Sequence, residues 1–163
     1  MSQAFKEWAP VIRALSAGEQ SLIIRKGGIA EDLGRFDTIA SRFWLIPTFF
    51  HAQRAKIKPT ARAYLTPAPA VPLVSTYAEL VSHEFVNNWS AVSALDAHHI
   101  LTAITVKERF DWGAPLGVHV LRIRVFRLRN PFPIELTAEQ SGCKSWIDID
   151  PEIEDFAATP VNP

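Results

Sequence analysis

The chain has 163 residues, of which 48% are hydrophobic, and 17 basic residues balance 17 acidic ones. This length fits one domain with a sizeable core, and the hydrophobic content excludes a disordered protein. A net charge of zero excludes attraction of the whole molecule to nucleic acid or membranes, so any such binding must come from local patches.

The chain carries one cysteine, Cys143, so it forms no internal disulfide and suits a reducing compartment. Its first residues include Lys6 and Glu7 and no apolar segment, unlike a signal peptide. The apolar runs are far shorter than the roughly 18 residues that span a bilayer. We therefore expect a cytoplasmic protein without a membrane partner, and the sequence leaves its oligomeric state open.

Residues 3–16 have the apolar spacing of a helix, which Gly18 would end. Pro10 interrupts the pattern: either the helix bends there, or a second helix begins with Pro10 in its first turn. A short strand follows over residues 20–26. The apolar positions of the helical face are Phe5, Trp8, Ile12 and Leu15.

A loop is expected over residues 29–41 and a second strand over 42–48, where Pro47 marks the strand end or a sheet edge. Residues 51–62 carry four lysines and arginines and no acidic residue, and prolines at 59, 67, 69 and 72 follow. We therefore expect an extended, exposed connection over residues 56–73.

The second half of the chain begins with two helical patterns. Residues 76–86 contain a capping box, Thr76 followed by Glu79, and predict a helix, although their β-branched content leaves a strand open. Residues 94–109 predict another helix, which ends at the sequence Asp-Trp-Gly.

Residues 117–129 are the clearest strand, because arginines alternate with aliphatic residues. The apolar phase flips at Val125–Phe126, which indicates a β-bulge or a strand that changes sheets. A last strand is expected over residues 145–149. The acidic end of the chain, 151–163, contains further prolines and is expected to be a disordered tail.

These elements predict an α+β fold in a single domain over residues 1–150. We expect a curved mixed or antiparallel sheet, or a partial barrel, with a helix at the N-terminus. One or two further helices would pack against this sheet.

The segment Arg25-Lys26-Gly27-Gly28 places two cations and two glycines directly after an apolar run. Guanidinium and ammonium groups donate charge-assisted hydrogen bonds to phosphate, and glycine lets backbone amides approach an anion. The spacing is not that of a P-loop. The segment is therefore a candidate phosphate site. The alternative is a strand end at which Arg25 pairs with an acid such as Glu7 or Glu31.

A metal-dependent nuclease is the enzyme that the charged residues would form if they converged. Such a site needs two carboxylates for Mg²⁺ or Mn²⁺ and a lysine near the attacking water. The short acid–x–lysine spacing at a strand end is missing, so no metal site is predicted and either ion is a cofactor only under this alternative. The candidate catalytic residues are Glu7, Lys26, Glu31, His51 and Glu108.

The five histidines show no metal-binding motif, because none is paired at the helical i, i+3 or i+4 spacing. His51 follows a strand end and is a candidate acid–base or phosphate-binding group, the alternative being a hydrogen-bonded loop residue.

Further candidate ligand-binding residues lie in two segments that mix charge with aromatic rings. Arg109 would hold phosphate and Trp112 would stack on a base, while burial of the aromatic residues is the alternative. Lys144 and Trp146 belong to the segment Ser-Gly-Cys-Lys-Ser-Trp. A basic stripe on strand 117–129 would track a nucleic-acid backbone or protect a sheet edge. Its arginines are Arg122, Arg124, Arg127 and Arg129.

The chain resembles the bacterial family of domain of unknown function 1802, and the resemblance runs from residue 5 to about residue 149. The matching residues are 5–8, 25–29, Glu31, Pro47, Thr48, His51, 108–110, Trp112, 121–128 and 142–146. This resemblance implies no particular activity.

Gly18 and Arg25 also match the outer positions of the Gly-x-Lys-x-x-Glu-x-Arg motif of ASCH domains, which are related to PUA RNA-binding barrels. Gln20 and Ile23 replace the lysine and the glutamate. The chain is thus similar to ASCH domains at two of four positions, without the glutamate that ASCH chemistry would use.

We interpret the chain first as a binding module for a phosphate-bearing ligand, a nucleic acid or a nucleotide. Residues 25–28 would hold phosphate, the basic residues of 54–58 would extend the contact, and Trp112 or Trp146 would stack. The first alternative is the metal-dependent nuclease or another phosphoester hydrolase. The second is a structural or interaction protein whose charged residues pair internally.

Overall fold

The structure, a computed structural model, describes residues 2–26, 40–142 and 144–161. None of its described helices is long and apolar enough to cross a membrane. The strands are β1 (Ser2–Trp8), β2 (Leu22–Arg25), β3 (Arg42–Thr48), β4 (Leu73–Val86), β5 (Val118–Pro133), β6 (Trp146–Ile149) and β7 (Ala158–Pro160). The α-helices are α1 (Ala9–Ala17), α2 (Gln53–Lys56), α3 (Trp89–Ser93) and α4 (Ala103–Asp111), and the 3₁₀ helices are η1 (Pro59–Tyr64), η2 (Asp96–His98) and η3 (Ile153–Asp155).

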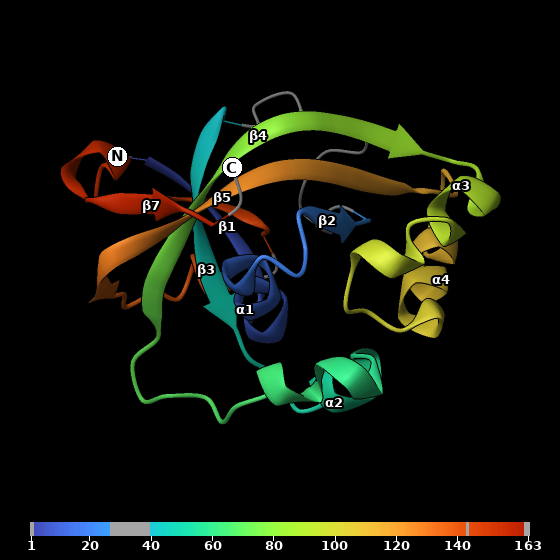
Figure 1. The fold of residues 1–163 in the computed structure, drawn as a ribbon, viewed down its shortest axis with the longest axis horizontal. Coiled ribbons are helices and arrows are strands. Elements are labelled where there is room, and N and C mark those ends of the chain that lie inside the picture. The colour runs from blue at the N-terminus through green and yellow to red at the C-terminus, as the bar shows by residue number, and fades with distance from the viewer. Residues whose placement is uncertain (1, 27–39, 143, 162–163) are drawn as a thin grey trace.

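The described strands form one sheet in the order β2-β5-β4-β3-β1-β6, and β7 also pairs with β5. The β1–β3 pair is parallel and the other pairs are antiparallel. Figure 1 shows β4 and β5 curving side by side, with α3 and α4 at one end of them. The predicted α+β fold with a curved, mixed sheet is confirmed. Among the described strands the sheet does not close, because β2 ends the order on one side and β6 on the other.

The N-terminal segment is a strand followed by a helix, and the single helix predicted over residues 3–16 is wrong. β1 lies between β3 and β6 and its residues 4–7 are buried, so both of its faces are covered. Such a strand lacks the alternation by which strands are recognised. Pro10 lies in the first turn of α1, as one alternative predicted, and Gly18 ends the helix with φ of 79°.

Both faces of the sheet carry apolar cores. In β3, Phe43 and Leu45 join the first core, which also contains α1, whereas Trp44 and Ile46 join the second core on the other face. Successive residues of β3 therefore alternate between two cores. This explains why the strand, predicted correctly over residues 42–48, reads as a continuous apolar run.

The two cores also explain the change of apolar phase in β5. Val125 lies in the first core, and Phe126 packs against the second. The pairing with β4 is regular here, since Val125 faces Ala78 and Phe126 faces Tyr77. The predicted bulge or change of sheet at this point is therefore wrong, and the irregularities of the β4–β5 pairing lie on either side of it.

Residues 76–86 belong to strand β4, so the predicted helix is wrong and the strand left open is correct. Glu79 of the capping-box pattern serves instead as a cross-strand partner. Its carboxylate lies 2.8 Å from Arg42 of β3 and 3.4 Å from Arg124 of β5. The pattern thus arises from pairing across the sheet and not from a helix terminus.

The single helix predicted over residues 94–109 is wrong, because this range is divided between η2 and α4, and α3 ends before it. The side chain of Thr102 accepts a hydrogen bond from the amide of Thr105 and so starts α4 only at Ala103. The connection predicted to be extended over residues 56–73 is also partly folded, because Pro59 opens η1. Apart from residues 57 and 58, only residues 65–72 of that connection lack helix and strand.

The acidic end of the chain, for which we expected a tail, forms η3 and β7 as far as the structure describes it. β7 pairs with β5. Ile153 is 4% exposed in the second core, and the ring of Phe156 lies 5.2 Å from that of Trp44. The indole nitrogen of Trp44 also donates to the carbonyl of Pro151 at 2.8 Å.

Lys26 holds the loop after α4. Its ammonium donates to the backbone carbonyls of Phe110, Pro115 and Gly117 at 3.2, 2.6 and 2.9 Å. Desolvation by burial lowers the pKa of Lys26, and Asp111 opposes this shift. The lysine therefore binds backbone carbonyls. The acidic partner in the sequence alternative was proposed for Arg25, and the structure places Arg25 3.6 Å from Glu7.

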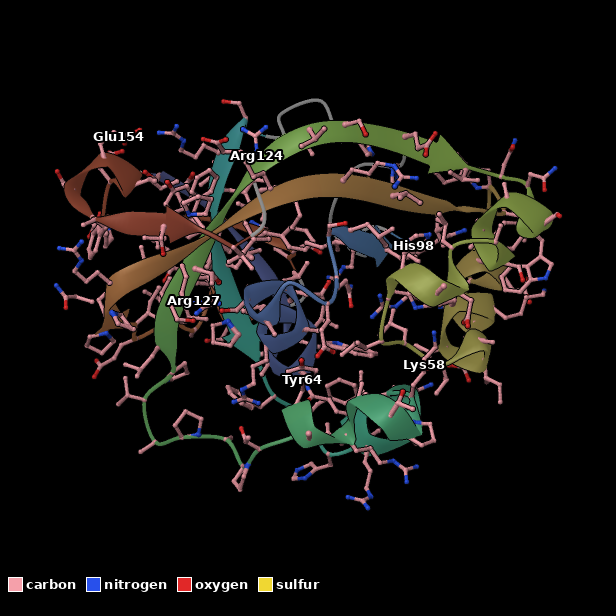
Figure 2. All side chains as sticks on the ribbon, viewed as in Figure 1. Lys58, Tyr64, His98, Arg124, Arg127 and Glu154 are labelled. Atoms are coloured by element: carbon pink, nitrogen blue, oxygen red, sulfur yellow. The ribbon has the colours of Figure 1, made fainter. Side chains whose placement is uncertain are left out.

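Two further lysines have the same role. Lys6 of β1 donates to two carbonyls of the turn around residues 140–142. Lys58 donates to two carbonyls of residues 96–99 and lies 3.1 Å from the carboxylate of Asp96. Figure 2 shows Lys58 between the α2–η1 segment and the helices beyond it. Lysine side chains thus fix three loops of the domain.

We predict that Ile153→Ala lowers the free energy of unfolding by about 2–5 kcal/mol, because it opens a cavity in the second core. Urea unfolding measures this change, with Ile104→Ala as the control, since Ile104 is 72% exposed. Equal stabilities of the two variants would show that the end of the chain does not dock on the sheet.

We predict that Lys26→Met lowers the free energy of unfolding by about 1–3 kcal/mol, because three carbonyls lose a charged donor. The matched control is Lys144→Met, whose lysine is 52% exposed and lies 3.6 Å from Glu139. That pair is expected to contribute less than about 1 kcal/mol. Thermal unfolding that gives the two variants the same midpoint would contradict the loop-holding role.

Candidate functional site

The open sheet has a gap, called here the seam, between β2 and the β1–β6 pair, and polar side chains span it. Arg25 is the last residue of β2, and its Nη2 donates to Oγ of Ser145, just before β6, at 2.7 Å. Its Nη1 lies 3.6 Å from Oε1 of Glu7 in β1. The guanidinium also lies over the ring of Phe5, 5.3 Å from the centroid. Arg25 therefore links the two ends of the strand order.

Arg109 of α4 approaches the same place. Its Nη1 donates to the carbonyl of Ile24 in β2, and its guanidinium lies 4.4 Å from the ring centroid of Trp8. Burial lowers the pKa of Arg109 to about 10, an effect that Glu7 opposes and Arg25 reinforces. The side chain therefore remains charged at neutral pH. Glu7, Arg25, Arg109 and Ser145 are called the seam cluster below.

Glu7 is the counterion of the seam cluster. The residue is 1% exposed, and its Oε1 also accepts a hydrogen bond from the amide of Trp8 at 2.7 Å. A buried carboxylate needs a cation and hydrogen-bond donors, which explains why Arg25 lies beside it. Across residues 2–26, 40–142 and 144–161, Glu7 is the one carboxylate that forms an ion pair with either arginine of the cluster. Two cations therefore face one anion.

Further donors lie next to the cluster. Trp146 packs between Phe5 and Phe43, at centroid distances of 4.8 and 4.9 Å. Its indole nitrogen is buried and has no hydrogen-bond partner among the described residues. Ser145, 1% exposed, uses its oxygen to accept from Arg25. Because buried donors are normally satisfied, this indole N–H is a donor that still lacks an acceptor among the described residues.

An aromatic pair borders the cluster on the side of β3. The ring of Trp8 lies between the Arg109 guanidinium and the ring of Phe50, 4.7 Å away. Phe50 is 38% exposed, and the next residue, His51, is exposed as well. Phe50 thus presents an exposed ring beside Trp8, and His51 follows it in the chain.

Among the sequence-predicted residues, the seam brings together Glu7, Arg25 and Arg109, with Trp146 behind Phe5 and His51 beside Phe50. Gly27, Gly28 and Glu31 lie outside the described residues. The other predicted residues lie elsewhere in the structure. They are Lys26 on loop carbonyls, Glu108 paired with Lys56, Trp112 exposed at the end of α4, and Lys144 beside Glu139.

The two described carboxylates of the nuclease alternative, Glu7 and Glu108, lie in different environments and do not share a site. Glu7 is buried against Arg25, whereas Glu108 is 54% exposed and pairs with Lys56. In the part of the chain that the structure describes, no group of three histidines, cysteines or carboxylates could hold a metal ion.

The arginines of β5 do not form one stripe. Alternation places Arg122 and Arg124 on one face and Arg127 and Arg129 on the other. Figure 2 shows Arg124 and Arg127 on different sides of the sheet. Arg124 lies 3.4 Å from Glu79, and Arg127 donates to the carbonyl of Ser16 at 2.6 Å.

The residues that match the ASCH motif lie on one continuous segment. Gly18 ends α1, and Arg25 belongs to the seam cluster. Gln20, in place of the motif's lysine, is 4% exposed, donates to the carbonyl of Leu22 and accepts from the amide of Ile100. Ile23, in place of the glutamate, is fully buried in the first core.

Sequence reasoning missed Trp8, Phe50 and Ser145 as neighbours of the site. Ser145 is 120 residues from Arg25, and only the pairing of β1 with β6 brings it close. The sequence pattern predicts Trp8 on the face of a helix, whereas the residue ends strand β1. The aromatic character of Phe50, one residue before His51, was the one available signal.

The fold is similar to crystal structures of ASCH proteins from Zymomonas mobilis. For a serine-to-alanine variant of ZmASCH the TM-score is 0.51 at 14% sequence identity, over 81% of this chain and 72% of that chain. For ASCH itself it is 0.50 at 14% identity, over 82% and 73%. At this identity the likeness shows the fold alone, and it agrees with the resemblance seen in the sequence.

Among proteins of curated function, none matches this sequence significantly. The family model described as "Domain of unknown function (DUF1802)" matches residues 4–163, which is nearly the whole chain. The chain therefore belongs to the DUF1802 family.

Proposed function

We propose that the seam cluster binds a phosphate-bearing ligand, a nucleic acid or a nucleotide. The observation that carries this proposal is the surplus of donors over acceptors. Among the described residues, Glu7 is the one carboxylate that forms an ion pair with either of the two guanidinium groups of the cluster. The ring of Trp146, like the Arg25 guanidinium, lies against Phe5, and its indole N–H is buried without an acceptor among these residues. A phosphate offers several acceptor oxygens and negative charge, which matches such a group of donors.

The surroundings of the cluster favour a ligand that carries a base. Phe50 presents an exposed ring next to Trp8, and base–aromatic stacking is a common means of binding single-stranded nucleic acid. Arg54, exposed on α2 only a few residues further on, is the cation of the 54–58 segment that supports this role most directly. Lys56 and Lys58 are paired with Glu108 and Asp96. The ASCH-like fold is consistent with this class of ligand.

A structural role is the second candidate, and a specific contact favours it. Arg109 donates to the carbonyl of Ile24 on the free edge of β2, so that its guanidinium already helps to satisfy the sheet edge. If this were its whole role, substitutions in the cluster would change stability and leave ligand binding at background. Binding and unfolding must therefore be measured on the same variants.

We predict that a short fluorescein-labelled RNA or DNA binds the wild-type protein at low salt, with an affinity that falls as salt rises. Arg25→Gln is expected to weaken this binding about tenfold or more, because a charge-assisted hydrogen bond to phosphate is lost. Fluorescence anisotropy measures the dissociation constant, and AMP and inorganic phosphate serve as competitors. Chelation of divalent ions with EDTA should leave binding unchanged.

The matched control is Arg129→Gln, which removes the same charge. Arg25 of β2 pairs with His119 at the start of β5, whereas Arg129 lies ten residues further along that strand. It should change the dissociation constant less than about twofold, apart from the general effect of charge. Equal affinities of the two variants, or no binding by the folded wild-type protein at low salt, would overturn the proposal.

A further inference from the structure

Two histidines on neighbouring strands direct ring nitrogens at each other. His83 lies in β4 and His119 in β5, and the register places them as diagonal neighbours on one face of the sheet. Nε2 of His83 lies 2.8 Å from Nδ1 of His119, and the ring centroids are 5.0 Å apart. Both side chains are partly exposed, so a small ion can reach them from solvent.

The separation of the two nitrogens matches one type of metal site. Two adjacent ligands of a square-planar ion, each about 2.0 Å from the metal, lie about 2.8 Å apart, whereas tetrahedral ligands lie about 3.3 Å apart. Square-planar coordination by nitrogen is typical of Cu²⁺ and Ni²⁺. We propose that Nε2 of His83 and Nδ1 of His119 chelate a Cu²⁺ or Ni²⁺ ion.

The protonation of the pair favours metal binding at neutral pH. Burial lowers the pKa of His83, and burial together with the charges of His83 and Lys26 lowers that of His119 to about 4. Glu84 opposes the shift of His83. Both imidazoles are therefore neutral near pH 7, the form in which histidine coordinates a metal.

Metal binding requires only local changes. One of the two facing nitrogens now donates a hydrogen bond to the other, so its proton must move to the far nitrogen of the same ring. Each ring stays neutral, and no net proton is released. The two N–metal bonds of a square-planar site meet at about 90°. Each imidazole ring must therefore rotate until its nitrogen lone pair points about 45° away from the line that joins the two nitrogens.

The affinity is expected to be moderate. Within the described residues no third histidine, cysteine or carboxylate completes the set, so water molecules take the remaining positions. The ammonium of Lys26, whose charge acts on His119, opposes a cation. These limits distinguish the pair from a structural zinc site, which needs four protein ligands.

Isothermal titration of the full chain with CuCl₂ and NiCl₂, and with MgCl₂ as a negative control, tests this site. The wild-type protein should bind one Cu²⁺ or Ni²⁺ more than the double variant His83→Gln/His119→Gln. Each single variant should weaken the binding of that ion about tenfold or more. His98→Gln is the matched control, because His98 is an exposed histidine that lies in η2 and not on β4 or β5.

Broadening of imidazole proton signals by substoichiometric Cu²⁺ gives a second readout on the wild-type protein, which does not depend on how the variants fold. The signals of His83 and His119 should broaden before those of His51 and His98. Preferential broadening of other histidines, or equal metal binding by the wild-type protein and the double variant, would overturn the proposal.

Discussion

The pairing of Glu7 with Arg25 across the seam is the interaction on which the arrangement of the site depends. A carboxylate that is 1% exposed is stable only with a cation and donors close by. This requirement holds the end of β1 against the end of β2, although the two strands lie far apart in the order of the sheet. Side chains, and no strand ladder among the described residues, therefore connect the two ends of the open sheet.

Side-chain donors satisfy the backbone wherever the ladder ends. On the free edge of β2, Gln20 and Arg109 donate to the carbonyls of Leu22 and Ile24, and on β6 Gln140 donates to the carbonyl of Asp148. Lysines do the same for three loops. Several of the cationic side chains that the sequence offers as ligand-binding candidates therefore donate to backbone carbonyls of the protein itself. The seam differs because its donors exceed its acceptors among the described residues.

Elements with a single strong signal could be predicted from the sequence. The strand 42–48 and the helix stop at Gly18 follow from local chemistry, and so does the alternative that places Pro10 in the first turn of a helix. The sequence failed where both faces of a strand are buried, as in β1, because the alternating pattern then disappears. Sequence-based prediction also failed at Thr76 and Glu79. Their spacing fits a helix cap, and it fits equally well a strand in which the glutamate pairs with residues of the neighbouring strands.

The candidate site likewise combines residues that local sequence identifies with contacts that only the strand pairing creates. Arg25 and Arg109 were identified from charge beside glycine or aromatic residues, but their convergence depends on strand order and could not be read locally. Ser145 reaches Arg25, and His119 reaches His83, only through pairings between segments far apart in the chain. Lys26 shows the opposite case, since a cation in a promising sequence turned out to hold backbone carbonyls.

Observation of the arginine side chains by NMR would test the central claim most directly. The Nε–Hε signals of Arg25 and Arg109 would be followed during titration with a short single-stranded RNA, with those of Arg122 and Arg129 as internal references. If the seam cluster supplies the unused donors, the signals of Arg25 and Arg109 shift together and saturate with the same dissociation constant. Shifts confined to other arginines, or none while the RNA binds, would contradict the account.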